Sequence, residues 1–112
     1  MRGTLTIVYP DKPMDVRIMS SVPEFEELQR LVGGLVTIIP GWDHCVTFSG
    51  AARPCTVLAN EEGLLLKLPF NFWATAAYQL VLRAKGAKGQ LQPLVGTVVI
   101  AEGDDDFMAL LL

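Results

Sequence analysis

The sequence has few cysteines, few charges and no long apolar run, and each shortage excludes a class of protein. Two cysteines, Cys45 and Cys55, are too few for a disulfide scaffold, and we expect free thiols. Charged residues make up only 19% of the chain and the net charge is −3, so no strong positive field attracts nucleic acid. No apolar run approaches the ~20 residues of a membrane span, and the first six residues lack the apolar region of a signal peptide. We therefore expect a cytoplasmic protein without a membrane partner.

What remains is the composition of one folded domain spanning residues 1–112. Hydrophobic residues make up 51% of the chain, which is too apolar for a disordered protein. A chain of 112 residues buries enough surface for one core, but not enough for a second domain or a spacious internal cleft. A ligand should therefore bind at the surface or between subunits.

Alternating apolar and polar residues predict the strands. Residues 4–9 and 15–20 alternate on either side of a turn at residues 10–13, which predicts an N-terminal hairpin. Residues 35–39 form a β-branched run that predicts a central strand. Further strands are expected at residues 45–48 and 55–59, paired through a turn at residues 49–54, and at residues 94–101. Residues 60–63 are expected to form a turn in which Gly63 supplies a positive φ.

The first helix is expected to follow Ser21, which would act as its N-cap with Glu24 completing a capping box. Apolar residues then recur at helical spacing up to Val32, and Gly33 supplies the left-handed stop.

The second helix is expected over residues 72–84, capped by Asn71 and stopped at Gly86. It is apolar nearly all round, so it must be covered on more than one face. We therefore expect it deep in the core or at a homo-oligomer interface. The residues expected at that interface are Phe72, Trp73, Ala77, Tyr78 and Leu82.

These elements predict an α+β fold of one domain, with a mainly antiparallel or mixed sheet of about five strands. Two helices and a short C-terminal element complete it. Residues 107–112 are almost wholly apolar, so we expect them to pack back as a short helix or strand. The acidic residues 104–106 would then cap that element and favour its N-terminal end.

Four short signatures occur in order along residues 21–108. They are Gly33-Gly34, Asn60-Glu61-Glu62-Gly63, Leu68-Pro69-Phe70-Asn71 and Gly96-Thr97-Val98-Val99-Ile100. In this order the chain resembles the domain-of-unknown-function family numbered 3846, which comprises small proteins found largely in phages, plasmids and mobile regions. The resemblance implies an accessory role, such as binding a host or defence protein, and it implies no catalytic residue. Here Phe70 stands where members often have a second proline.

The only group of histidine, cysteine and aspartate in the sequence is Trp42-Asp43-His44-Cys45. An enzyme would have to use Cys45 with His44, or Glu62, as its reactive groups. Neighbouring residues of a strand point to opposite faces, however, so His44 and Cys45 should diverge. We expect no metal site, because structural zinc takes four nitrogen or sulfur ligands and only His44, Cys45 and Cys55 are present.

Three cations at the end of the second helix, Arg83, Lys85 and Lys88, offer the alternative of a nucleic-acid-binding module. Basic residues also favour helix C-termini on electrostatic grounds, which explains them without a ligand. We do not expect nucleic acid to be the partner.

The leading hypothesis is a small, non-enzymatic binding or regulatory protein without a cofactor. Its partner would be a host or defence protein or a small polar ligand, and the chain would form a homo-oligomer. The residues expected at the ligand site are Asn60, Glu61, Glu62 and Asn71.

Overall fold

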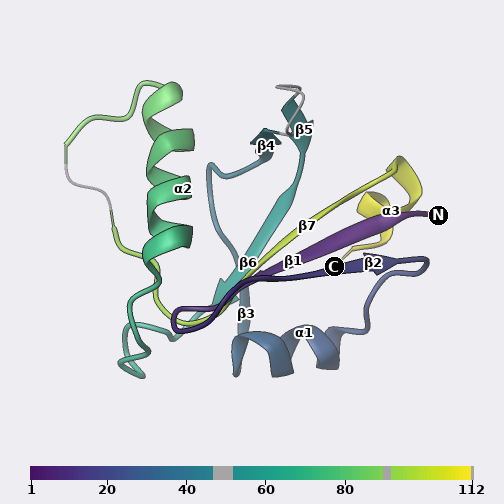
Figure 1. Cartoon of the computed structure of the whole chain (residues 1–112), viewed down its shortest axis with the longest axis horizontal. Helices are drawn as coiled ribbons and strands as arrows, with labels where there is room; N and C mark the ends of the chain where they lie inside the picture. The colour runs from purple at the N-terminus through teal and green to yellow at the C-terminus, as the bar shows by residue number, and fades with distance from the viewer. Residues whose placement is uncertain (47–51, 90–91, 112) are drawn as a thin grey trace.

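The computed structural model describes residues 1–46, 52–89 and 92–111, and its architecture is α+β, as predicted (Figure 1). A five-stranded, fully antiparallel sheet has the order β2-β1-β7-β6-β3. Its strands are β2 (Asp15–Met19), β1 (Gly3–Val8), β7 (Val98–Gly103), β6 (Thr56–Asn60) and β3 (Val36–Ile38). A second sheet pairs β4 (His44–Val46) with β5 (Ala52–Pro54). The helices are α1 (Phe25–Val32), α2 (Phe72–Ala84) and α3 (Asp105–Leu110).

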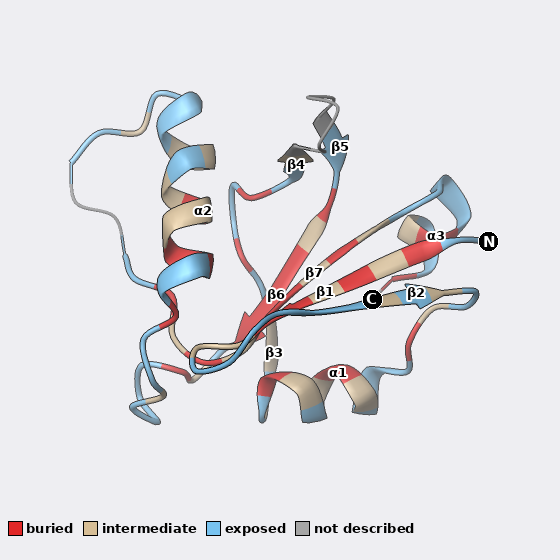
Figure 2. Cartoon of the chain, viewed as in Figure 1, coloured by how far each residue is buried: buried red, intermediate tan, exposed pale blue. Residues whose placement is uncertain are grey.

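Helices pack on both faces of the large sheet, so the domain has two apolar cores. On β1, Leu5 and Ile7 point to the face covered by α1 and α3, while Val8 points to the face covered by α2. The central strands β1, β7 and β6 are therefore largely buried, whereas the edge strand β2 is mostly exposed (Figure 2). None of the helices in the described ranges combines the length and apolarity needed to cross a membrane.

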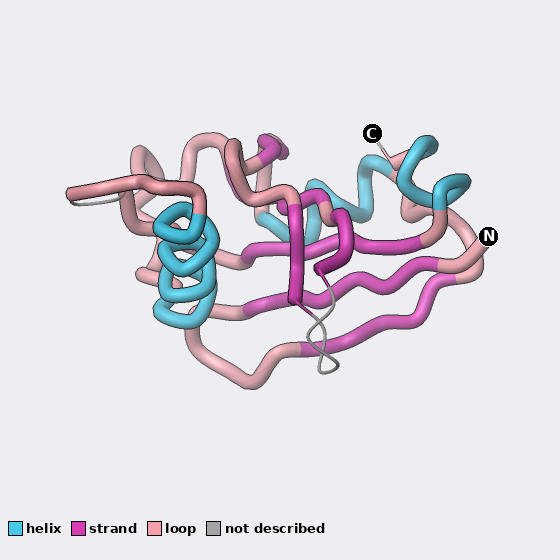
Figure 3. Tube along the Cα trace, turned by 90° about the horizontal axis from the view of Figure 1, so that it is seen from above, coloured by secondary structure: helices cyan, strands magenta, loops and turns pink. Residues whose placement is uncertain are grey.

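Helix α2 lies at one end of the strands and does not extend along them (Figure 3). Its N-terminus is fixed by Asn71, whose Oδ1 accepts from the Ala74 N–H at 3.1 Å, so the predicted N-cap is confirmed. The predicted stop is also confirmed, because Gly86 has φ 93° and the next N–H bonds back to Leu82. Among the described residues, α2 is the helix that packs on this face of the sheet.

The two other helices begin differently from one another. The expected capping box of α1 is wrong: its N-cap residue is Glu24, whose side chain makes no capping bond, and Ser21 lies farther from the helix. The reason is that Pro23 is buried and the exposed Glu24 is still extended, so the chain turns helical only at Phe25. The apolar tail does pack back as a helix, with the Asp104 carboxylate accepting from the Phe107 N–H at 2.9 Å.

Two strand predictions need correction. The run at residues 35–39 is not central, since β3 pairs only with β6 and forms the second edge. The strand expected at 45–48 appears as β4, which pairs with β5 and not with residues 55–59; Phe48 lies outside the described residues. The chain leaves the small sheet after Pro54, and residues 56–60 join the large sheet as β6.

The last strand also starts later than predicted. Strand β7 begins at Val98 because Gly96, with φ 73°, turns the chain just before it. Val95 forms only an isolated bridge with Phe70.

Candidate functional site

A cavity of about 630 Å³ opens beside the turn at residues 60–63, where the sequence predicted a ligand site. This size is within the usual range of small-molecule pockets. Three segments and one helix enclose it: the ends of β3 and β6, the turn at residues 60–65, residues 92–95, and one side of α2. Its apolar lining includes Ile39, Ala59, Tyr78, Leu82 and Leu94.

The first wall is the turn, and Asn60 fixes it in place. The Asn60 Oδ1 accepts from the Glu62 N–H at 2.8 Å, and its Nδ2 donates to the Val32 carbonyl at 3.2 Å. The Glu61 N–H donates to the Leu35 carbonyl at 2.8 Å, which ties the turn to the chain leaving α1. Asn60 therefore holds Glu62 through its own side chain, the Leu35 carbonyl holds Glu61, and the Asn60 side chain is engaged inside the protein.

Gly63 closes the turn for a reason other than the predicted one. Its φ is not positive, so it does not supply a left-handed residue. A Cβ at this position would instead approach Val95 Cγ2 to 2.8 Å. Glycine is needed here because the turn packs directly on the opposite wall of the cavity.

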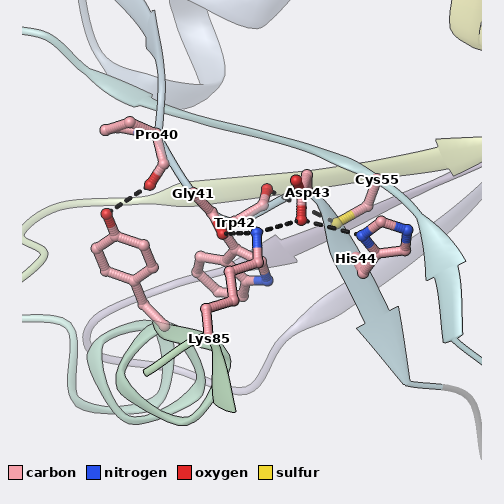
Figure 4. A network of polar contacts seen from close by, with 8 residues as sticks. Pro40, Gly41, Trp42, Asp43, His44, Cys55 and Lys85 are labelled. Atoms are coloured by element: carbon pink, nitrogen blue, oxygen red, sulfur yellow. Dashed lines mark hydrogen bonds and ion pairs between the residues drawn. The ribbon is translucent and has the colours of Figure 1, made fainter. Parts of the chain in front are cut away.

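The second wall is formed by α2 and the segment following β3. The Tyr78 hydroxyl donates to the Pro40 carbonyl at 2.6 Å, and its ring stacks on Trp42 with centroids 5.7 Å apart. Below them, Lys85 Nζ lies 2.7 Å from Asp43 Oδ1 and donates to the Gly41 carbonyl (Figure 4). The hydrogen bond from Lys85 to the Asp43 carboxylate, followed by the contact with His44, lowers the pKa of Asp43 to about 2. The segment is thereby held against the helix.

The third wall, residues 92–95, is fixed to the start of α2. The Thr75 hydroxyl donates to the Leu94 carbonyl at 3.2 Å and accepts from the Leu94 N–H at 2.9 Å. The Asn71 N–H donates to the same carbonyl at 2.9 Å. Since each wall is held by internal hydrogen bonds, the cavity exists before any ligand arrives.

The charge of the cavity is negative. Its lining holds two carboxylates, Glu61 and Glu62, and contains no lysine, arginine or histidine among the described residues. Within those residues, neither glutamate forms an ion pair. The mouth is apolar because Leu64 and Leu65 are exposed beside it.

Asn71 is not at this site, although the sequence placed it there. Its side chain is fully buried, and Nδ2 donates to the carbonyls of Val8 and Gly96, both at 2.8 Å. Together with the capping bond from the Ala74 N–H, all three hydrogen bonds of the Asn71 side chain are to groups inside the protein. The sequence correctly predicts the turn and the helix cap. It does not distinguish a residue that binds a ligand from one that stabilises the fold.

The residues expected at an α2 interface separate into two groups. Phe72 and Trp73 are exposed at 62% and 67%, as an interface would require. Tyr78 is buried, and Ala77 and Leu82 pack against the same core, because this side of the helix faces the sheet. Tyr78 and Leu82, expected either in the core or at a partner interface, thus pack in the core and also line the cavity.

The group around Cys45 is not arranged as a nucleophile and base. His44 Nδ1 lies 3.0 Å from Asp43 Oδ1, so the imidazole is directed at its other neighbour. The Cys55 thiol donates to the Trp42 carbonyl at 4.0 Å and can instead donate to the Cys45 thiolate, which lowers the pKa of Cys45; the same interaction and burial raise the pKa of Cys55. No cluster of three or more histidine, cysteine or acidic side chains able to hold a metal occurs in the described ranges.

This thiol pair gives a testable difference in reactivity. We expect iodoacetamide at neutral pH to alkylate the partly exposed Cys45 roughly tenfold faster than the buried Cys55, because the thiolate is the reacting form. In a Cys55→Ala variant the alkylation of Cys45 should slow, since the hydrogen bond to its thiolate is lost. Mass spectrometry of the alkylated peptides against time measures both rates, and equal rates in the folded protein would contradict the expectation.

Two of the three cations at the end of α2, Arg83 and Lys85, are engaged within the protein. Lys85 is engaged with Asp43 and Gly41, and Arg83 donates to the Gly89 carbonyl at 3.0 Å. These contacts fasten the C-terminus of the helix, which agrees with the electrostatic explanation of basic residues at that position.

Comparison with known proteins identifies a family. The model of a family described as domain of unknown function (DUF3846) matches residues 1–111, which extends beyond the signatures at residues 21–108. No curated protein and no solved structure matches the chain.

Proposed function

The chain belongs to the domain-of-unknown-function family DUF3846, and from that premise we propose that it is a small, non-enzymatic binding protein whose ligand occupies the cavity beside residues 60–63. The observation that carries the proposal is the preformed cavity of about 630 Å³ with two carboxylates and an apolar interior. The mobile-element setting implied by the resemblance is part of the proposal, with the protein acting there as an accessory.

The lining defines the chemistry of the ligand. Apolar side chains such as Ile39, Leu82 and Leu94 favour an apolar body, because burying such surface is the main source of small-molecule affinity. Glu61 and Glu62 favour a positive group at the turn, since a cation would pair with carboxylates that have no cationic neighbour in the described lining. The ligand class is therefore a small aliphatic or aromatic amine.

Binding, and not catalysis, is the activity that fits these residues best. Catalysis would need an acid-base or nucleophilic pair in contact with the ligand. Cys45, Cys55 and His44 are not part of the cavity lining, and Glu62 shares the described lining with a second carboxylate, Glu61, but with no histidine, lysine or cysteine.

A matched pair of probes tests the proposal. We expect hexylammonium to bind in the cavity and heptanoate, which has the same six-carbon apolar chain and the opposite charge, to bind at least about tenfold more weakly. Titration calorimetry gives both affinities, and amide chemical shifts of residues 60–65 and 92–95 report the location. The double variant E61Q/E62Q should remove most of the preference for the cation.

The control variant is Glu26→Gln, which removes an equivalent carboxylate from the exposed side of α1, outside the cavity. It should bind hexylammonium as the unaltered protein does. Equal binding of the two probes, or shifts confined to residues outside the cavity, would refute the proposed ligand class and site.

A further inference from the structure

Strand β2 is an unprotected edge of the large sheet. It pairs with β1 on one side only, and its residues Val16 and Ile18 are 57% and 88% exposed. Proteins usually protect such edges by keeping them short or by placing proline or lysine in them. The other edge follows that rule, because β3 has three residues and Pro40 follows soon after. Strand β2 is mostly exposed (Figure 2). It has five residues, contains neither proline nor lysine, and carries one charge of each sign, Asp15 and Arg17.

The hydrogen-bonding groups available on this edge belong to Val16 and Ile18. The Asp104 N–H donates to the Arg2 carbonyl, so even-numbered positions of β1 bond to β7 and odd-numbered positions bond to β2. The partners of those odd positions are Asp15, Arg17 and Met19. It follows that the N–H and C=O groups of Val16 and Ile18 point away from the sheet.

We propose that β2 pairs antiparallel with β2 of a second copy of this chain, about a two-fold axis at Val16, giving a continuous ten-stranded sheet. The outward N–H of Val16 would donate to the Val16 carbonyl of the second copy, and the Val16 carbonyl would accept from the Val16 N–H of that copy. This register places Asp15 opposite Arg17 of the second copy, and Arg17 opposite Asp15 of the second copy. Met14 meets Ile18 of the second copy on the other face.

The charges and apolar side chains of the segment select both the occupant and the register. Opposite charges facing each other across two strands stabilise a pair, and like charges destabilise it. An axis at Arg17 would place two arginines in direct opposition, whereas the axis at Val16 forms two opposite-charge pairs. The same axis brings together Met14, Val16 and Ile18 of both copies, all more than half exposed in the single chain. A segment with these properties is complementary to itself.

The groups already facing Arg17 are compatible with this arrangement. Its guanidinium lies 3.2 Å from Asp15 and 3.4 Å from Glu27 of α1, and all three side chains are partly open to solvent. An additional carboxylate from the second copy would therefore join an existing ion-pair network. The apolar row lies on the opposite face, since Val16 and Ile18 are opposite Thr6 and Thr4, on the same face as Val8.

The test uses charge exchange in the full chain, with sedimentation equilibrium measuring the dimer dissociation constant. Each of D15R and R17D makes the facing pairs like-charged, so each alone should dimerise at least about tenfold more weakly. An equimolar mixture of the two restores opposite charges at both pairs and should recover the dimer as a heterodimer. The control D11R makes the same change of charge as D15R in the turn before β2, and it should dimerise as the unaltered chain does.

A second variant, Val16→Pro, removes only the outward N–H and leaves the pairing with β1 intact. It should be folded by circular dichroism and monomeric. A wild-type chain that is monomeric at every concentration would overturn the proposal. A dimer that persists in both D15R and V16P would also overturn it and would point to the exposed side of α2. A mixture of D15R and R17D that dimerises no more than either variant alone would overturn it as well.

Discussion

Replacing Asn71 with alanine is expected to lower the free energy of unfolding by about 3–5 kcal/mol, one of the largest effects in the chain. The side chain makes three hydrogen bonds from a fully buried position. Losing the N-cap of α2 accounts for about 1 kcal/mol of this. The carbonyls of Val8 and Gly96 lose a donor that water reaches poorly, and each such group adds about 1–2 kcal/mol.

Asn71→Asp separates these two contributions. Aspartate still caps the helix, because its carboxylate accepts from the Ala74 N–H as the amide oxygen does. It cannot donate, and it brings a negative charge toward two carbonyl oxygens, so it should be at least as destabilising as alanine at neutral pH. Urea unfolding of both variants measures the difference. An aspartate variant close in stability to the unaltered protein would show that the cap, and not the pair of donated bonds, is what matters.

The position of Asn71 explains why the fold was more predictable than the site. Helix caps, turns and alternation act over a few residues, and the sequence therefore located α2, the β1–β2 hairpin and the turn at residues 60–63. The partners of the Asn71 amide are Val8 and Gly96, which are 63 and 25 positions away. No local pattern contains that information, so an asparagine suited to a ligand site turned out to connect three parts of the core.

The errors in strand position have the same origin. The β-branched run at residues 35–39 has the composition of a buried strand, but its place at the edge depends on which strands pair with one another, and composition does not carry that information. The N-terminal hairpin supplies β1 and β2, and β7 from the other end of the chain pairs with β1 along its whole length. Strand β3 therefore pairs with β6 alone and lies at the edge.

The cavity illustrates a further limit. Glu61 and Glu62 were predicted as site residues from a turn signature, and they do lie in the lining. The apolar walls come from α2 and from the segments around residues 39 and 94, which are distant in the sequence. Apolar residues are unusual at the tip of a turn, so the three consecutive exposed leucines at residues 64–66 are the local signal in the sequence for the mouth of the cavity.

The packing of α3 provides the second large effect, at Gly3. This glycine lies on β1 directly opposite Gly103 of β7, and the Phe107 ring occupies the space above both. A Cβ at residue 3 would lie 2.5 Å from three carbons of that fully buried ring. Gly3→Ala should therefore destabilise the domain by about 3 kcal/mol, since an overfilled core must displace its neighbours. Thermal or urea unfolding measures the loss.

A double-mutant cycle with Phe107→Leu shows whether the ring is the cause. Phe107→Leu alone should cost about 1–3 kcal/mol through lost burial. In that background Gly3→Ala should cost less than about 1 kcal/mol, because the smaller side chain leaves room for the methyl group. An undiminished cost would mean that the strain arises in the backbone of β1 and not at the ring.

Gly103→Ala is the matched comparison, because its Cβ would approach both the ring and the main chain. The methyl group would lie 2.6 Å from Phe107 Cδ1 and also 2.6 Å from the Arg2 carbonyl oxygen. That oxygen is held by the Asp104 N–H at 2.9 Å, so it cannot withdraw without breaking the junction between β1 and α3. Phe107→Leu should therefore rescue Gly3→Ala much more than Gly103→Ala. Equal rescue at both positions would show that the strand end yields as readily as a side chain.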